Sequence, residues 1–129
     1  MEPSDAISIE ATFEPQVLKA YDRNEVSMTL KFSGAAQERY LWCECDVTVA
    51  SPLSLAPDQE LGAAHTRVGI LKPGSSLEKR VNLYTRPNNF PDEYRVGITA
   101  FFYDDDGAIA ERREYKAVIP CTEAERAKP

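Results

Sequence analysis

Hydrophobic and polar residues alternate along much of the chain, in short runs that are separated by turn residues. A period of two places apolar side chains on one face of a strand and polar side chains on the other, so each run predicts a half-buried β-strand. The cleanest alternation covers residues 26–32. Further strands are expected at residues 7–13, 40–49, 66–71, 77–85, 94–103 and 108–119. Pro15 interrupts the first run, which resumes at 16–20, and a proline favours a place at a sheet edge.

Seven runs at this spacing predict an all-β protein, an immunoglobulin-like antiparallel β-sandwich of about seven strands. Tyr94 begins the sixth run, where that fold often places a hydrogen-bonded tyrosine. The charged segment 111–114 favours an exposed edge for the last strand. Pro120 is expected to end that strand, and His65 is expected in a loop. We therefore expect a single domain over residues 1–121 and a polar tail over residues 122–129.

Three motifs lie within residues 66–119: Leu71-Lys72-Pro73-Gly74-Ser75, Tyr94-Arg95-Val96-Gly97-Ile98 and the hairpin Tyr103-Asp104-Asp105-Asp106-Gly107. In these motifs the chain resembles the CARDB-type adhesion modules of bacteria and archaea, which are immunoglobulin-like domains. The resemblance implies a binding or spacer unit without catalysis. The chain lacks the asparagine pair common near the last strand of such modules. Its first residues also lack the basic and apolar regions of a secretory signal, so we expect a cytoplasmic location.

Composition and charge narrow the range of partners. Among 129 residues, 15 are Lys or Arg and 21 are Asp or Glu, which gives a net charge of -6. Nucleic-acid binding needs a basic surface, so no nucleic-acid partner is expected. No apolar run approaches the roughly 20 residues that span a bilayer, so no membrane is expected as a partner either. The excess acid is confined to residues 1–64, which carry 11 acidic and 4 basic residues.

Candidate catalytic and metal-binding groups are few. The chain has three cysteines (Cys43, Cys45 and Cys121) and one histidine, His65, whereas structural zinc needs four ligands. Small buried thiols are the simplest interpretation of the cysteines, and a thiol-dependent enzyme centred on Cys43, Cys45 or His65 is an alternative. The tip at Asp104–Asp106 offers few of the six to eight oxygens that calcium requires. We expect no metal and no cofactor.

The candidate site is an aromatic patch on the outer face of one sheet. Alternation points Tyr40 and Trp42 outward from one strand, and Phe101 and Tyr103 outward from a neighbour. The expected pairing sets Tyr40 opposite Tyr103, Trp42 opposite Phe101, Glu44 opposite Thr99 and Thr48 opposite Arg95. The acidic residues Asp104, Asp105 and Asp106 and the Ser33–Arg39 loop adjoin this patch.

Exposed aromatic patches are typical of interaction sites. The sequence therefore predicts a non-enzymatic module that binds a protein partner, or a second copy of itself as a homodimer, through this face. A partner with a basic rim around an apolar centre would suit it. A small-ligand or carbohydrate-binding module on the same surface is an alternative. A further alternative is that the aromatic pairs stabilise the sheet and have no binding role. Glu44 and Asp46 are expected on a solvated face.

Overall fold

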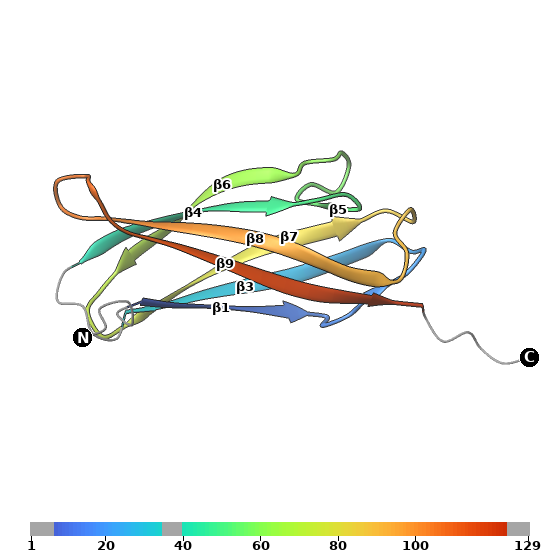
Figure 1. Ribbon diagram of the computed structural model, residues 1–129, viewed down its shortest axis with the longest axis horizontal. Helices are drawn as coiled ribbons and strands as arrows, with labels where there is room; N and C mark the ends of the chain where they lie inside the picture. Colours follow the sequence, from blue (N-terminus) through green and yellow to red (C-terminus); the bar gives the residue numbers. More distant parts are fainter. Residues whose placement is uncertain (1–6, 35–39, 124–129) are drawn as a thin grey trace, which may run out of the picture.

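The computed structural model describes residues 7–34 and 40–123, and all regular structure in this part is β. Two sheets face each other, and their strands run along the long axis of the molecule (Figure 1). Seven long strands and two of two residues each were found. They are β1 (Ile7–Glu14), β2 (Leu18–Lys19), β3 (Asn24–Gly34), β4 (Leu41–Val49), β5 (Leu53–Ser54), β6 (Ala63–Leu71), β7 (Ser76–Thr85), β8 (Asp92–Tyr103) and β9 (Ile109–Thr122). The predicted all-β class is confirmed, and each predicted run coincides with one long strand.

The first sheet has the strand order β1-β3-β7-β5 and the second sheet has the order β2-β9-β8-β4-β6. Strands β1 and β2, separated by Pro15, lie in different sheets, so the chain crosses between the layers at this interruption. The edge position predicted for the first run is confirmed, since β1 pairs with β3 alone. No helix long and apolar enough to cross a membrane occurs among the residues described.

Two local predictions were wrong. His65 lies in β6, opposite Asp46 of β4, and not in a loop. A bulge at Gly69, whose φ is 140°, shifts the register, and the β4–β6 pairing then continues to Ala63. Pro120 does not end the last strand, which continues to Thr122 because Cys121 pairs with both β8 and β2. Pro120 has no backbone N–H to donate to a ladder. The pairing of the next residue, Cys121, with strands on both sides compensates for this missing hydrogen bond.

Apolar residues of both inner faces form one core. Phe32 of the first sheet meets Phe102 of the second edge to face, with ring centroids 6.2 Å apart, and both are fully buried. Burial of a side chain of this size contributes about 1.5–3 kcal/mol. All three cysteines are buried and unpaired, as predicted.

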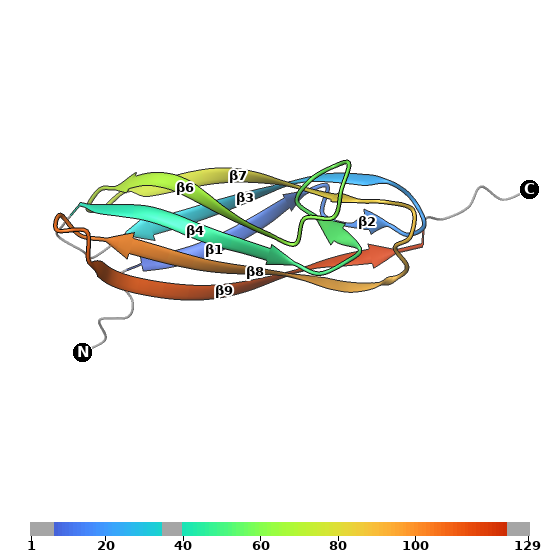
Figure 2. The ribbon, with the colours of Figure 1, turned by 90° about the horizontal axis from the view of Figure 1, so that it is seen from above.

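Charged side chains point inward along the two open sides of the sandwich. On β7, Lys79 is half-buried in the row of Leu77, Val81 and Leu83, along a stretch that β5 leaves unpaired. Figure 2 shows β6 beside this part of β7. On β9, Arg113 donates from Nη2 to the carbonyl of Ile7 at 2.8 Å. Inward charges on an open edge discourage the addition of a further strand, which explains why Lys79 breaks the apolar pattern.

The same role fits a pair of charges on β9. The Nε of Arg113 lies 2.8 Å from Glu111 Oε2, an ion pair without hydrogen-bond geometry. Both side chains are half-buried, and β2 covers this strand only at Cys121 and Thr122. The contact of Arg113 with Ile7 also joins the second sheet to the edge of the first.

A buried asparagine fastens the end of the sandwich where β2, β3 and β7 meet. The Oδ1 of Asn89 accepts hydrogen bonds from the amides of Tyr21 at 2.6 Å and Asp22 at 3.3 Å. Its Nδ2 donates to the carbonyl of Lys19 and to Thr85 Oγ1, both at 3.1 Å. Asn89 is 1% exposed, so these bonds satisfy groups that water cannot readily reach.

Candidate functional site

The outer faces of the two sheets differ in character. The register of β1, β3 and β7 aligns polar residues in rows across the first sheet, such as Ser8, Ser33 and Ser76. Apart from Tyr84, the outward positions of these strands are polar or charged: Ser8, Glu10, Thr12, Glu14, Glu25, Ser27, Thr29, Lys31, Ser33, Ser76, Glu78, Arg80 and Asn82. A polar surface of this kind suits contact with water.

The outer face of the second sheet instead carries an apolar row across four strands. Trp42 of β4 lies opposite Ile70 of β6 and opposite Tyr103 of β8, and Tyr103 lies opposite Ile109 of β9. The exposed fractions are 37% for Trp42, 50% for Ile70 and 54% for Ile109. We call these four residues, Ile70, Trp42, Tyr103 and Ile109, the apolar row.

Phe101 extends the apolar row toward the middle of the sheet. Its ring stacks beside that of Tyr103 with centroids 6.5 Å apart, and the guanidinium of Arg112 lies 5.9 Å from the Phe101 centroid. Tyr40, which directly precedes β4, is 58% exposed. The structure therefore brings together Trp42, Phe101 and Tyr103 and adds Ile70 and Ile109 to them, whereas Tyr40 lies before the ladder and is not opposite Tyr103 as predicted.

The predicted pairing of these strands was wrong by two residues. Trp42 lies opposite Tyr103 instead of Phe101, Glu44 opposite Phe101 instead of Thr99, and Thr48 opposite Gly97. A shift of two residues leaves every side chain on the same face, so the alternation of apolar and polar residues does not distinguish the two registers.

A chain of hydrogen bonds connects the apolar row to His65. The indole Nε1 of Trp42 donates to Glu44 Oε2 at 2.5 Å. The ring nitrogens of His65 lie 2.5 Å from Glu44 Oε1 and 2.5 Å from Asp46 Oδ1. These contacts raise the pKa of His65, with Asp46 the larger cause, and the bonds from Trp42 and His65 lower the pKa of Glu44.

This cluster does not form a metal site. The two nitrogens of His65 face different carboxylates from opposite sides of the ring, so the three side chains do not converge on one point. Within residues 7–34 and 40–123, no group of three His, Cys, Asp or Glu residues is arranged to hold a metal ion. Through Glu44, the cluster contacts the indole of Trp42 and so can orient it.

The acidic hairpin tip is held by the side chain of Asp104. Asp104 Oδ1 accepts from the amides of Asp106 at 2.9 Å and Ala108 at 3.1 Å, and Gly107 takes a φ of 81° in the turn. The carboxylate of Asp104 thus shapes the turn, while Asp105 and Asp106 are exposed. Most of the adjoining Ser33–Arg39 loop, residues 35–39, lies outside the described part of the chain.

The thiols lie on the opposite side of β4 from His65. Cys43 and Cys45 point into the core, whereas His65 is exposed on the outer face. Burial raises the pKa of Cys43 to about 12, with smaller contributions from Cys45 and Glu44, and raises that of Cys45 to about 11, with a smaller contribution from Asp46. A protonated thiol is a poor nucleophile, so this geometry counts against a Cys–His pair.

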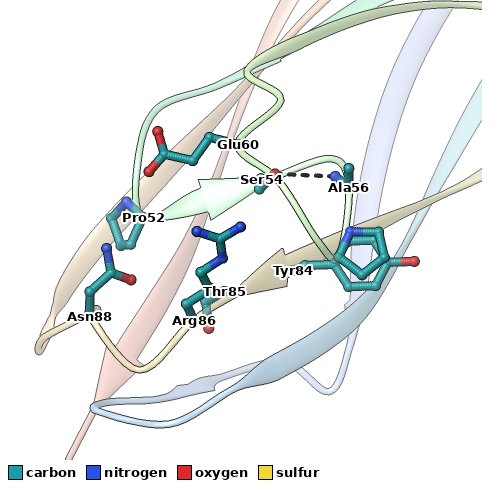
Figure 3. Close-up of a pocket in the computed structure, with 9 residues that line it drawn as sticks. Pro52, Ser54, Ala56, Glu60, Tyr84, Thr85, Arg86 and Asn88 are labelled. Atoms are coloured by element: carbon teal, nitrogen blue, oxygen red, sulfur yellow. Dashed lines mark hydrogen bonds between the residues drawn. The ribbon is translucent and has the colours of Figure 1, made fainter.

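A small hollow lies beside β5 and the end of β7 (Figure 3). Ser54 organises its wall, because its Oγ donates to the carbonyl of Gln59 and accepts from the amides of Ala56 and Leu61. The cavity volume is about 10 Å³, close to the space that one water molecule needs. The hollow is too small for an organic ligand.

Comparisons with known proteins show the fold and no family. No family model and no curated protein match the chain. A solved structure of AvmM, described as catalysing macrocyclization in alchivemycin A biosynthesis, is similar with a TM-score of 0.55 and 11% identity, over 95% of this chain and 92% of that one. The sporulation control protein Spo0M from Bacillus subtilis is similar with a TM-score of 0.50 and 11% identity, over 93% of this chain and 50% of that one.

Proposed function

We propose that the chain is an immunoglobulin-like, non-enzymatic module that binds another protein through the apolar row. The strand arrangement supports the fold assignment, since β1-β3-β7 and β4-β8-β9 correspond to strands A-B-E and C-F-G of such sandwiches. The hydroxyl of Tyr94 donates to the carbonyl of Phe90 at 2.5 Å, four residues upstream, as a tyrosine corner does. The resemblance to CARDB-type modules supports the same assignment.

The observation that carries the functional proposal is the exposed apolar row on the second sheet, which contrasts with the polar outer face of the first sheet. Trp and Tyr dominate the energetics of protein interfaces, and exposed apolar side chains gathered on one face are a property of interaction sites. Ile70, Trp42 and Ile109 are each more than one-third exposed, so the stability of the sheet alone does not use their full surface. Docking on the face is favoured over strand addition because Lys79, Glu111 and Arg113 protect the open edges.

The proposal is tested by removing the apolar row and measuring association. The double variant Trp42→Ala/Ile70→Ser should lose a partner that the wild-type protein captures, or should convert a dimer to a monomer in sedimentation experiments. The matched control is Tyr84→Ala/Thr29→Ala on the outer face of the first sheet, which should leave association unchanged. Equal association of both variants, with intact circular dichroism, would overturn the proposal.

The carbohydrate-binding alternative uses the same surface, and one measurement separates it from protein binding. Trp42 is the single tryptophan, so its fluorescence reports directly on the apolar row. Saturable quenching by a sugar would favour the carbohydrate alternative, and quenching by a captured protein alone would favour the present proposal.

A further inference from the structure

A second hollow lies on the outer face of the second sheet, away from the apolar row. It has a volume of about 300 Å³ and is lined by Thr48, Val49, Ala50, Arg95, Gly97 and Lys116. The register places Gly97 of β8 between Thr48 of β4 and Lys116 of β9. Gly97 therefore forms the floor, and the two side chains flank it. Along β4, Thr48 lies six residues from Trp42, which corresponds to about 20 Å.

The backbone does not require a glycine at this position. The φ of Gly97 lies outside the left-handed region, where Gly69, Gly74 and Gly107 are found. Strand β8 is paired on both sides here, and a glycine weakens the interior of a strand. A Cβ at this position would lie 2.7 Å from Thr48 Oγ1, so a larger residue must displace the Thr48 hydroxyl, and this cross-strand contact favours a glycine. Glycine inside a strand often marks a close approach by a ligand.

Two unpaired cations surround the glycine. Arg95 and Lys116 are exposed, and neither forms an ion pair with any residue that the structure describes. Farther along β9, by contrast, Arg112 is paired with Glu114 at 2.9 Å and Arg113 with Glu111. The charges of Arg95 and Lys116 are therefore not neutralised by a contacting carboxylate of the described residues.

We propose that this hollow, the Gly97 site, binds an oxyanion, namely a carboxylate or phosphate group. The guanidinium of Arg95 and the ammonium of Lys116 supply charge-assisted donors, and the hydroxyl of Thr48 supplies a neutral one. The absent side chain of Gly97 lets the anion approach the sheet between them. The volume is at the lower end of the range for small-molecule sites. The proposal is independent of the apolar row.

The test is a titration of the ¹⁵N-labelled protein with inorganic phosphate and, separately, with acetate, at constant ionic strength set by chloride. Saturable shifts of the Gly97, Thr48 and Lys116 amides are expected with at least one of the two anions, and the one that binds more tightly identifies the preferred group. Lys116→Gln and Arg95→Gln should each weaken binding by at least tenfold. Arg112→Gln, which removes a cation from the same strand, should change it less than twofold.

The variant Gly97→Ala separates a built site from general charge attraction. It retains both cations, fills the floor and displaces the Thr48 hydroxyl, so the proposal expects binding to weaken at least tenfold while the spectrum stays that of a folded protein. Non-saturable shifts in the wild-type protein would overturn the proposal, as would equal binding by Gly97→Ala. If Gly97→Ala does not fold, the contrast of Lys116→Gln with Arg112→Gln decides.

Discussion

The buried side chain of Asn89 gives the sharpest prediction about stability. Replacement by alanine removes four hydrogen bonds, two accepted from the amides of Tyr21 and Asp22 and two donated to Lys19 and Thr85. A typical hydrogen bond contributes about 1 kcal/mol, which gives an upper value of about 4 kcal/mol. The bond from Asp22 is long, at 3.3 Å, and its residue is exposed, so water can replace it. We therefore expect Asn89→Ala to lower the free energy of unfolding by about 3 kcal/mol.

Urea unfolding followed by circular dichroism measures this loss. With a slope of about 1.5 kcal/mol per molar urea, the midpoint should fall by about 2 M. Asn88→Ala is the matched control, because Asn88 is the adjacent asparagine, is exposed and has no hydrogen bond from its side chain to a described residue. That variant should stay within about 0.5 kcal/mol of the wild type. A loss below about 1 kcal/mol for Asn89→Ala would refute the reasoning, since it would mean that water satisfies the freed groups.

Three further predictions concern titration, thiol chemistry and the open edge. Proton NMR should give His65 a pKa above its ordinary value of 6.5, and Asp46→Asn should lower that pKa. The stabilisation from the contact of His65 with Asp46 is complete below pH 6.5 and is lost as pH rises through the raised pKa. An unshifted pKa of His65 would contradict this contact. Ellman's reagent at pH 8 should modify the three thiols more than a hundredfold faster in urea than in the native protein, and a rapid native reaction would show an accessible thiol. Lys79→Val should associate in a concentration-dependent way, measured by light scattering, at concentrations where the wild-type protein and the control Arg80→Val do not. Equal scattering by all three proteins would argue against a protective role for Lys79.

The strands could be predicted from the sequence because alternation records burial directly. Along β4 the apolar positions 41, 43, 45 and 47 are all buried, as the period of two requires. The alternation carries no information about which residues of two strands pair, and the predicted β4–β8 register was wrong by two residues for that reason. The alternation predicted residues 66–71 of β6, including the bulge at Gly69, but not residues 63–65, because Ala63, Ala64 and His65 carry no apolar–polar alternation; His65 was therefore expected in a loop.

In the candidate site too, the sequence predicted which face a side chain takes but not which residues of other strands it meets. Parity placed Trp42, Phe101 and Tyr103 outward, because each shares a strand with buried alternate neighbours. Ile70 and Ile109 were missed because each stands near a turn, where alternation is short. The contact of His65 with Glu44 and Asp46 depends on the pairing of β4 with β6, and the intervals of 21 and 19 residues carry no local signal.

Trp42 links the apolar row to the cluster of Glu44, His65 and Asp46. Its indole forms part of the apolar row, and its Nε1 donates to Glu44, which in turn contacts His65. Only the imidazolium form of His65 has a hydrogen on both ring nitrogens, so deprotonation removes a donor from one of its two carboxylate contacts. Glu44 and Asp46 then repel each other with less compensation, and the acceptor that orients the indole becomes less fixed. If the apolar row binds a partner, its affinity should therefore weaken as pH rises through the raised pKa of His65. The same change in pH should leave affinity unaltered in His65→Gln, which cannot titrate.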